Sequence, residues 1–146
     1  MGLCGLMLYP NVDAGSERIV RAIRGMEEAG KLQRLHKYKH IPVEEYVPLM
    51  RHAAVLIGYS SAAIREGSYL GAPAVNIGTR QNGRERGANV LNVAHDRSQI
   101  RQAIEVQMDH GSYPSDPLYG NGQAGAGVAE VLATAELGPI QKTLSY

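Results

Sequence analysis

The sequence contains no tryptophan or phenylalanine, only one cysteine, and almost no net charge. Without those two residue types, its eight tyrosines are the only large aromatic side chains, which argues against a stacking platform for single-stranded nucleic acid. A formal charge of +1 predicts no broad attraction to nucleic acid or to a membrane surface. Any site for an anion must therefore be local.

The single cysteine, Cys4, stands in an apolar segment and cannot form a disulfide within the chain. We expect it to be a small buried core residue in a protein of the reducing cytoplasm. The histidines are too scattered for a metal site, and we expect neither a metal nor a cofactor. No apolar stretch is long enough to span a bilayer, and the opening residues lack the basic segment of a secretory signal. We therefore expect no membrane partner.

Short apolar runs alternate with segments of helical periodicity along most of the chain. Strands are predicted at residues 3–9, 32–39, 53–58, 74–77 and 89–93, and helices at 16–30, 43–52, 60–70, 96–110 and 124–136. Ser16 is the expected N-cap of the first helix, and Pro48 suggests that the second becomes regular only near Tyr46. This alternation predicts an α/β, Rossmann-like, doubly wound and mainly parallel sheet. We expect one domain over residues 1–136, followed by a tail at 137–146.

The stretch Ile57-Gly58-Tyr59-Ser60-Ser61 reads as the end of a strand, a tight turn and the start of a helix. Unpaired backbone N–H groups and the two serine hydroxyls would favour a phosphate at such a junction. Glu66, further along the same predicted helix, would suit a ribose diol, because a carboxylate accepts hydrogen bonds from both hydroxyls. The alternative is structural: a serine at a helix start is commonly only an N-cap, and Glu66 would then be a solvated helix residue.

Polar residues also follow the other predicted strands. Asn11 follows the first, His40 and Ile41 the second, and Arg80 the fourth. Parallel α/β sheets bind ligands outside the carboxyl ends of their strands, so these loops are predicted to meet at one rim with the serines. Their agreement favours a nucleotide-type ligand over a purely structural domain.

The same residues resemble the hydrolysing UDP-N-acetylglucosamine 2-epimerases of sialic and nonulosonic acid synthesis. The most specific series is Ser60-Ser61, then Arg65-Glu66, then Gly78-Thr79-Arg80-Gln81. The resemblance runs from about Tyr9 to the loop near Gly122, through the segments 9–16, 39–42, 57–61, 64–66, 71–73, 76–81, 83–85 and 89–91.

The resemblance implies the C-terminal, UDP-binding half of a two-domain GT-B enzyme. It implies diphosphate contacts at Ser60 and Ser61, a ribose contact at Glu66, and a uracil contact from the Ile41 backbone. Asn11 and Arg80 are implied to be further UDP contacts. In that family UDP leaves UDP-GlcNAc as a proton leaves C2, and water converts the intermediate to N-acetylmannosamine. The proton-transfer residues are expected in an N-terminal half, so this chain is expected to be inactive alone and to need a partner domain or to self-associate.

Some positions depart from the family pattern. Tyr59 stands where an asparagine is common, which changes the expected shape of the pocket. Arg21, Lys39 and His40 resemble a regulatory or interface site of related animal enzymes, but Glu17 reverses a charge there. Alternatively, Arg21, Lys39 and His40 are ordinary charged residues of the protein surface.

Other functions remain open on the sequence. A UDP-sugar-binding module without chemistry, a GT-B glycosyltransferase fragment and a non-hydrolysing epimerase would all share the same fold and nucleotide site. The Gly78-Thr79-Arg80-Gln81 motif favours the hydrolysing epimerase.

Overall fold

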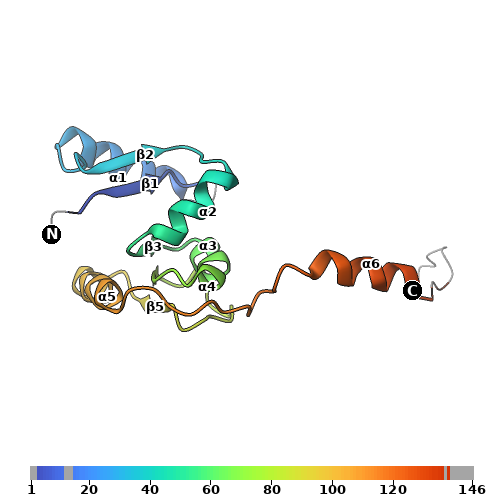
Figure 1. Cartoon of the computed structure of the whole chain (residues 1–146). Coiled ribbons are helices and arrows are strands. Elements are labelled where there is room, and N and C mark those ends of the chain that lie inside the picture. Colours follow the sequence, from blue (N-terminus) through green and yellow to red (C-terminus); the bar gives the residue numbers. More distant parts are fainter. Residues whose placement is uncertain (1–2, 12–14, 137, 139–146) are drawn as a thin grey trace, which may run out of the picture. The chain divides into compact units, whose positions relative to one another are not determined.

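The computed structural model describes residues 3–11, 15–136 and 138 (Figure 1). Its contacts divide the chain into two compact units, Met1–Pro48 and Leu49–Tyr146. Every pairing between described strands is parallel, and helices separate most of the strands, so the predicted α/β class is confirmed. The described strands form two sheets, in the orders β1-β2 and β3-β4-β5, rather than the one sheet we expected.

The first unit contains strand β1 (Gly5–Leu8), helix α1 (Ser16–Glu28) and strand β2 (Leu35–Tyr38). The two strands pair in register from Gly5 with Leu35 to Leu8 with Tyr38. Both strands are shorter than predicted. Residues 12–14, between β1 and α1, lie outside the described residues.

Two expectations about the first unit are wrong. Gly15, with φ at 86°, is the N-cap of α1, and Ser16 is the first helical residue without a side-chain capping bond. The left-handed conformation at this cap suits glycine, which has no Cβ to clash. Cys4 is exposed rather than buried, because it precedes a strand in which residues alternate between half-buried and exposed.

Helix α2 (Val43–His52) has the predicted bounds and contains Pro48 in its interior. It becomes regular at its first turn, not near Tyr46, since the backbone N–H groups of Glu45 and Tyr46 both donate to the Pro42 carbonyl. Pro48 therefore costs the helix an internal hydrogen bond without delaying its start.

The second unit is built on strands β3 (Leu56–Gly58), β4 (Ala74–Ile77) and β5 (Val90–Val93), with β4 in the centre. Helices α3 (Ser61–Ile64) and α4 (Glu66–Leu70) connect β3 to β4. Helix α5 (Arg97–His110) follows β5 and packs on β4 and β5, whereas α3 packs on β3 and β4. Helix α6 (Ala124–Thr134) ends the described secondary structure, and the predicted tail lies almost wholly outside the described residues.

The core of the second unit is centred on Ile64, Ala74 and Val90, with Leu56 and Ala63 packed around them. A polar group also belongs to this interior. Gln107 of α5 is fully buried, and its side-chain Nε2 donates to the backbone oxygens of Ala74 and Asn89 at 2.8 Å each. The Tyr113 hydroxyl donates to Gln107 Oε1 at 2.7 Å, so every polar atom of this buried amide group has a partner.

The predicted helix over residues 60–70 is interrupted at Arg65. Ile64 at the end of α3 and Gly67 and Ser68 in α4 are all buried, so the two short helices turn their inner faces to the core separately. Helix α4 ends at Gly71, whose φ of 65° and close approach to the Tyr113 carbonyl require glycine. Within the described residues, no helix is both long and apolar enough to cross a membrane.

Candidate functional site

Two polar loops leave the same edge of the three-stranded sheet. Gly58 pairs with Asn76, and Asn76 with Asn92, so the carboxyl ends of β3, β4 and β5 are level. The serine turn, residues 59–61, follows β3 directly. The arginine loop, residues 78–87, follows β4. Parallel strands bring these segments to one rim, as predicted, and this rim is where α/β sheets bind ligands.

The arginine loop contacts the serine turn through the backbone carbonyl of Tyr59. Gln81 Nε2 donates to this oxygen at 2.8 Å, and Arg80 Nη1 lies 3.4 Å from it. The Arg80 guanidinium also lies over the Tyr59 ring, 5.5 Å from its centre, within the range of a cation–π contact. The structure therefore brings a permanent positive charge beside the residue that precedes Ser60.

Ser60 is the N-cap of α3, as the structural alternative predicted. Its Oγ accepts from the Ala62 backbone N–H at 3.3 Å. This does not exclude a ligand, because a serine hydroxyl that accepts one hydrogen bond still has a proton to donate. Ser60 is exposed, and Ser61, the first residue of α3, is half-buried.

The interruption at Arg65 changes the predicted geometry around Glu66. Glu66 does not share a helix with the serines: it opens α4, where it is exposed. A helix of four residues such as α3 also has a much smaller dipole than a long helix, so the favourable charge at this rim comes mainly from Arg80. The prediction of one continuous helix over residues 60–70 is therefore wrong.

Asn11 and Ile41 lie in the first unit. Each stands three positions beyond a paired strand end, since Leu8 and Tyr38 are the last register partners of β1 and β2. They therefore follow the carboxyl edge of the two-stranded sheet. Their meeting with Ser60 and Arg80 at one nucleotide stays a prediction.

The residues suggested for a regulatory or interface site are also in the first unit. Arg21 on α1, and Lys39 and His40 after β2, are all exposed. Exposure suits both a binding role and plain surface charge, so these assignments stay predictions.

Gln81 is the residue at this rim that sequence reasoning did not assign to the site. Its side chain is 3% exposed, although Arg80 and Asn82 on either side are exposed. Arg86 Nη2 donates to the Gln81 backbone oxygen at 2.7 Å, which ties the end of the arginine loop to its middle. The available signal was its place immediately after Arg80 in a loop otherwise rich in glycine and charge.

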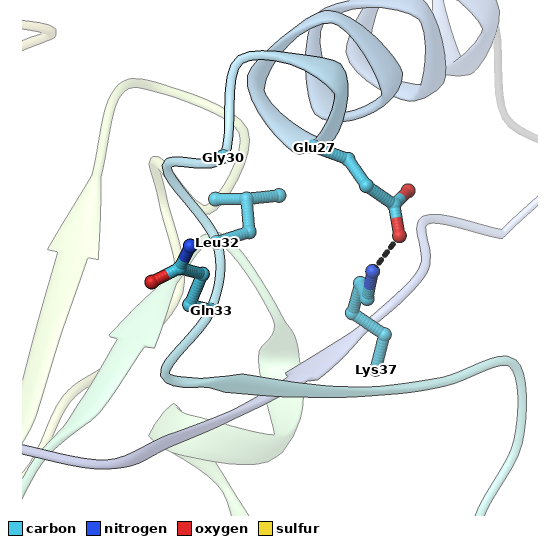
Figure 2. Close-up of a pocket in the computed structure, with 5 residues that line it drawn as sticks. All are labelled: Glu27, Gly30, Leu32, Gln33 and Lys37. Carbon is cyan, nitrogen blue, oxygen red and sulfur yellow. Dashed lines mark hydrogen bonds and ion pairs between the residues drawn. The ribbon is translucent and has the colours of Figure 1, made fainter.

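A shallow pocket occurs elsewhere, where α1 turns toward β2. It measures about 220 Å³, less than most small-molecule sites, and is lined by Glu27, Gly30, Leu32, Gln33 and Lys37. Figure 2 shows that the Lys37 ammonium faces the Glu27 carboxylate, and the two groups form an ion pair. The pocket thus offers a ligand little uncompensated charge. Among the residues that the structure describes, no group of three or more His, Cys, Asp or Glu side chains could hold a metal.

A titrating group with a clear shift lies beyond β5. The pKa of Asp96 is lowered from its ordinary value of 3.8 because its carboxylate accepts hydrogen bonds from the Ser98 hydroxyl and the Gln99 backbone N–H. Asp96 is the N-cap of α5, with the Gln99 nitrogen at 2.9 Å. Its role is to fix the start of the helix that covers the central strand.

Comparison with known proteins gives consistent relatives. A family model described as UDP-N-acetylglucosamine 2-epimerase matches residues 3–133. A UDP-N-acetylglucosamine 2-epimerase of Neisseria meningitidis serogroup B is 28% identical over 117 residues, covering 80% of this chain and 30% of that protein. A polysialic acid biosynthesis protein P7 of Escherichia coli is 32% identical over 104 residues, covering 71% of this chain and 26% of that protein.

A third relative is the hydrolysing UDP-N,N'-diacetylbacillosamine 2-epimerase of Legionella pneumophila. It is 28% identical over 132 residues, covering 90% of this chain and 34% of that protein. The chain thus spans about a third or less of the length of these curated relatives. Since the family model matches nearly the whole sequence, the chain belongs to the UDP-N-acetylglucosamine 2-epimerase family.

Proposed function

We propose that this chain is the UDP-binding half of a hydrolysing UDP-N-acetylglucosamine 2-epimerase with the GT-B architecture. In this proposal Ser60, Ser61 and Arg80 hold the diphosphate and Glu66 binds the ribose. Asn11 and the Ile41 backbone complete the nucleotide site on the uracil side. The substrate is a UDP-sugar, UDP-GlcNAc or a close relative, and the lone cysteine suits a cytoplasmic enzyme.

The observation that carries the proposal is the contact between the arginine loop and the serine turn. Arg80 and Gln81 both reach the Tyr59 carbonyl, so a guanidinium and two serine hydroxyls share one rim of the sheet. Guanidinium groups and hydroxyls are strong hydrogen-bond donors to phosphate oxygens. The hydrolysing reaction is supported by the hydrolysing relative from Legionella pneumophila.

In this role the chain stabilises a leaving group. As the bond between the sugar and the diphosphate breaks, negative charge grows on the diphosphate. Donors fixed beside it lower the energy of the transition state more than that of the bound substrate. The product would be N-acetylmannosamine, and the polysialic acid protein among the relatives supports a place in sialic or nonulosonic acid synthesis.

Proton transfer at C2 is proposed to use residues outside this chain, in an N-terminal half of the enzyme. The 146 residues alone are then expected to bind UDP weakly, to release no UDP from UDP-GlcNAc, and to self-associate unless the partner half is present. A coupled assay for free UDP tests the second point. Release of UDP by the purified chain at a rate above the uncatalysed background would contradict it.

The nucleotide site itself is tested by calorimetric titration with UDP. Arg80→Ala is expected to weaken binding by roughly 10- to 100-fold, as removal of a charge-assisted hydrogen bond does, and Ser61→Ala and Glu66→Ala by about 5- to 10-fold. Arg101→Ala is the matched control, because it removes the same charge from the exposed face of α5, where Arg101 pairs with Glu105. Equal losses in Arg80→Ala and Arg101→Ala, or no binding by wild type at millimolar UDP, would overturn the proposal for this chain.

A further inference from the structure

Gln81 combines features that a surface loop residue rarely has. It is a polar side chain, 3% exposed, between two exposed neighbours, and it donates a 2.8 Å hydrogen bond to a carbonyl 22 positions earlier in the chain. Buried polar groups in proteins are normally hydrogen-bonded. Here the bond joins two loops at the proposed diphosphate site.

The bonded carbonyl controls the direction of the next amide. A trans peptide is planar, so its C=O and N–H point in opposite directions. The Tyr59 oxygen accepts the shorter hydrogen bond from Gln81, at 2.8 Å, and a longer one from Arg80, at 3.4 Å, so the Ser60 N–H points away from both side chains. Gly58, with φ at 146°, precedes Tyr59 and adopts a backbone conformation that other residues rarely take, so the entry to the turn depends on glycine.

Gln81 is itself held in place. Its backbone oxygen accepts from Arg86 Nη2 at 2.7 Å and from the Arg84 backbone N–H at 3.3 Å. The carbonyl of Glu85 accepts from the Tyr119 hydroxyl at 2.5 Å, which fixes the far part of the arginine loop. The Gln81 side chain that donates to Tyr59 thus belongs to a loop that is itself held by hydrogen bonds.

The side-chain amide of Gln81 can bond the Tyr59 carbonyl in only one of its two orientations. Only the NH₂ end of the amide can face the Tyr59 carbonyl, which leaves Gln81 Oε1 buried, with no hydrogen-bond partner in the described part of the chain. A glutamate of the same shape would place an acceptor against an acceptor. A methionine would fill the same space without a donor.

We propose that Gln81 is the positioning residue of the serine turn, and that its hydrogen bond to Tyr59 sets the orientation in which Ser60 and Ser61 meet a diphosphate. This inference rests on the proposed function of that turn. Gln81 acts through the Tyr59–Ser60 peptide and does not itself touch the nucleotide.

The first test is independent of any ligand. Amide exchange measured by NMR is expected to be about tenfold faster at Ala62 and Arg65 in Gln81→Met than in wild type, with the exchange of β4 unchanged, because these two N–H groups donate to the Ser60 hydroxyl and the Ser61 carbonyl. Asn82→Met is the control, because it changes the exposed neighbour. If Gln81→Met and the control exchange alike at these two amides, the inference is overturned.

A measurement on wild type covers the case in which the variants fail to fold. The side-chain NH₂ of Gln81 is expected to exchange at least about tenfold more slowly than that of Gln102, an exposed glutamine of α5. Equal rates at the two side chains would overturn the inference without any substitution.

Ligand binding then separates the inference from the proposed function. UDP affinity is expected to fall about tenfold in Gln81→Met and further in Gln81→Glu, while uridine affinity stays within about twofold of wild type. Parallel losses for UDP and uridine would indicate only general destabilisation and would contradict a positioning role. If wild type binds no UDP but Gln81→Met still loosens the serine turn, the proposed function fails and the positioning contact stands.

Discussion

The two sheets of this molecule are built from the same kind of parallel pairing but differ sharply in burial. In β4, Ala74, Val75 and Asn76 are at most 2% exposed, whereas β1 and β2 only alternate between half-buried and exposed residues. β4 has a strand on each side, and α3 and α5 pack against it. Among the described strands, β1 and β2 pair only with each other.

This difference in burial indicates which part of the proposed site is held rigidly. The serine turn and the arginine loop both leave a sheet with a buried centre, which holds Ser60 and Arg80 to a fixed frame. Asn11 and Ile41 follow a sheet that retains exposed apolar side chains, including Leu6 at 42% and Leu8 at 37%. We therefore expect the diphosphate part of the proposed site to be preformed and the uracil part to be looser.

The sharpest test of this comparison uses the same substitution in each unit. Ile64→Ala, at a fully buried position of the second unit, is expected to cost about 2–5 kcal/mol of its stability because it leaves a cavity in the core. Ile23→Ala, at the buried position of α1, is expected to cost less, since a loosely packed site collapses more easily. Urea unfolding followed by tyrosine fluorescence and by NMR would assign the losses. A larger loss from Ile23→Ala would contradict the tighter packing of the second unit.

The buried amide of the second unit provides the next largest effect. Gln107→Ala is expected to cost about 2–3 kcal/mol, because the Ala74 and Asn89 carbonyls and the Tyr113 hydroxyl lose a buried partner. Gln102→Ala, on the exposed face of the same helix, is the matched control. Thermal unfolding of both variants checks the difference. Similar melting temperatures would mean that the interior of the second unit is as adaptable as the first.

The smallest expected effect is the pH dependence of the helix cap at Asp96. The pKa of Asp96 is lowered in the folded chain, so this carboxylate stabilises the fold above its unfolded pKa near 3.8. That contribution is lost as the pH falls below about 4 and through the lower folded pKa. Urea midpoints of wild type and Asp96→Asn should therefore differ at pH 6 and converge at the acid end. A constant difference across that range would contradict the assignment.

The sequence predicted the elements whose signals are local. Residues 74–77 form β4 as expected, because a short apolar run between Pro73 and Gly78 fits a central strand. The serine turn and the arginine loop were expected at one rim because loops after parallel strands leave the same edge of a sheet, and the structure places both there. Predicting the α/β class required only the alternation of apolar runs with segments of helical periodicity.

The features that the sequence did not predict depend on packing. Nothing between Ser60 and Glu66 is a glycine or a proline, yet the helix breaks at Arg65 where Ile64 and Ser68 are both buried. In the sequence Gln81 is an ordinary loop residue, and only the structure shows that its side chain donates to the Tyr59 carbonyl. Separation into two sheets likewise depends on which strands pair, and strand periodicity does not specify pairing.

Helix α6 has a thermodynamic consequence of its own. None of its residues is buried, and Val128, Val131 and Leu132 are 58–72% exposed. A helix of 11 residues is marginal in water even with good helix formers, and Gly125 and Gly127 lower its propensity further. Its helical population is therefore set by solvent and temperature as much as by the fold. Residues 124–134 should melt gradually over a broad range, below the cooperative transition of the sheet that precedes them.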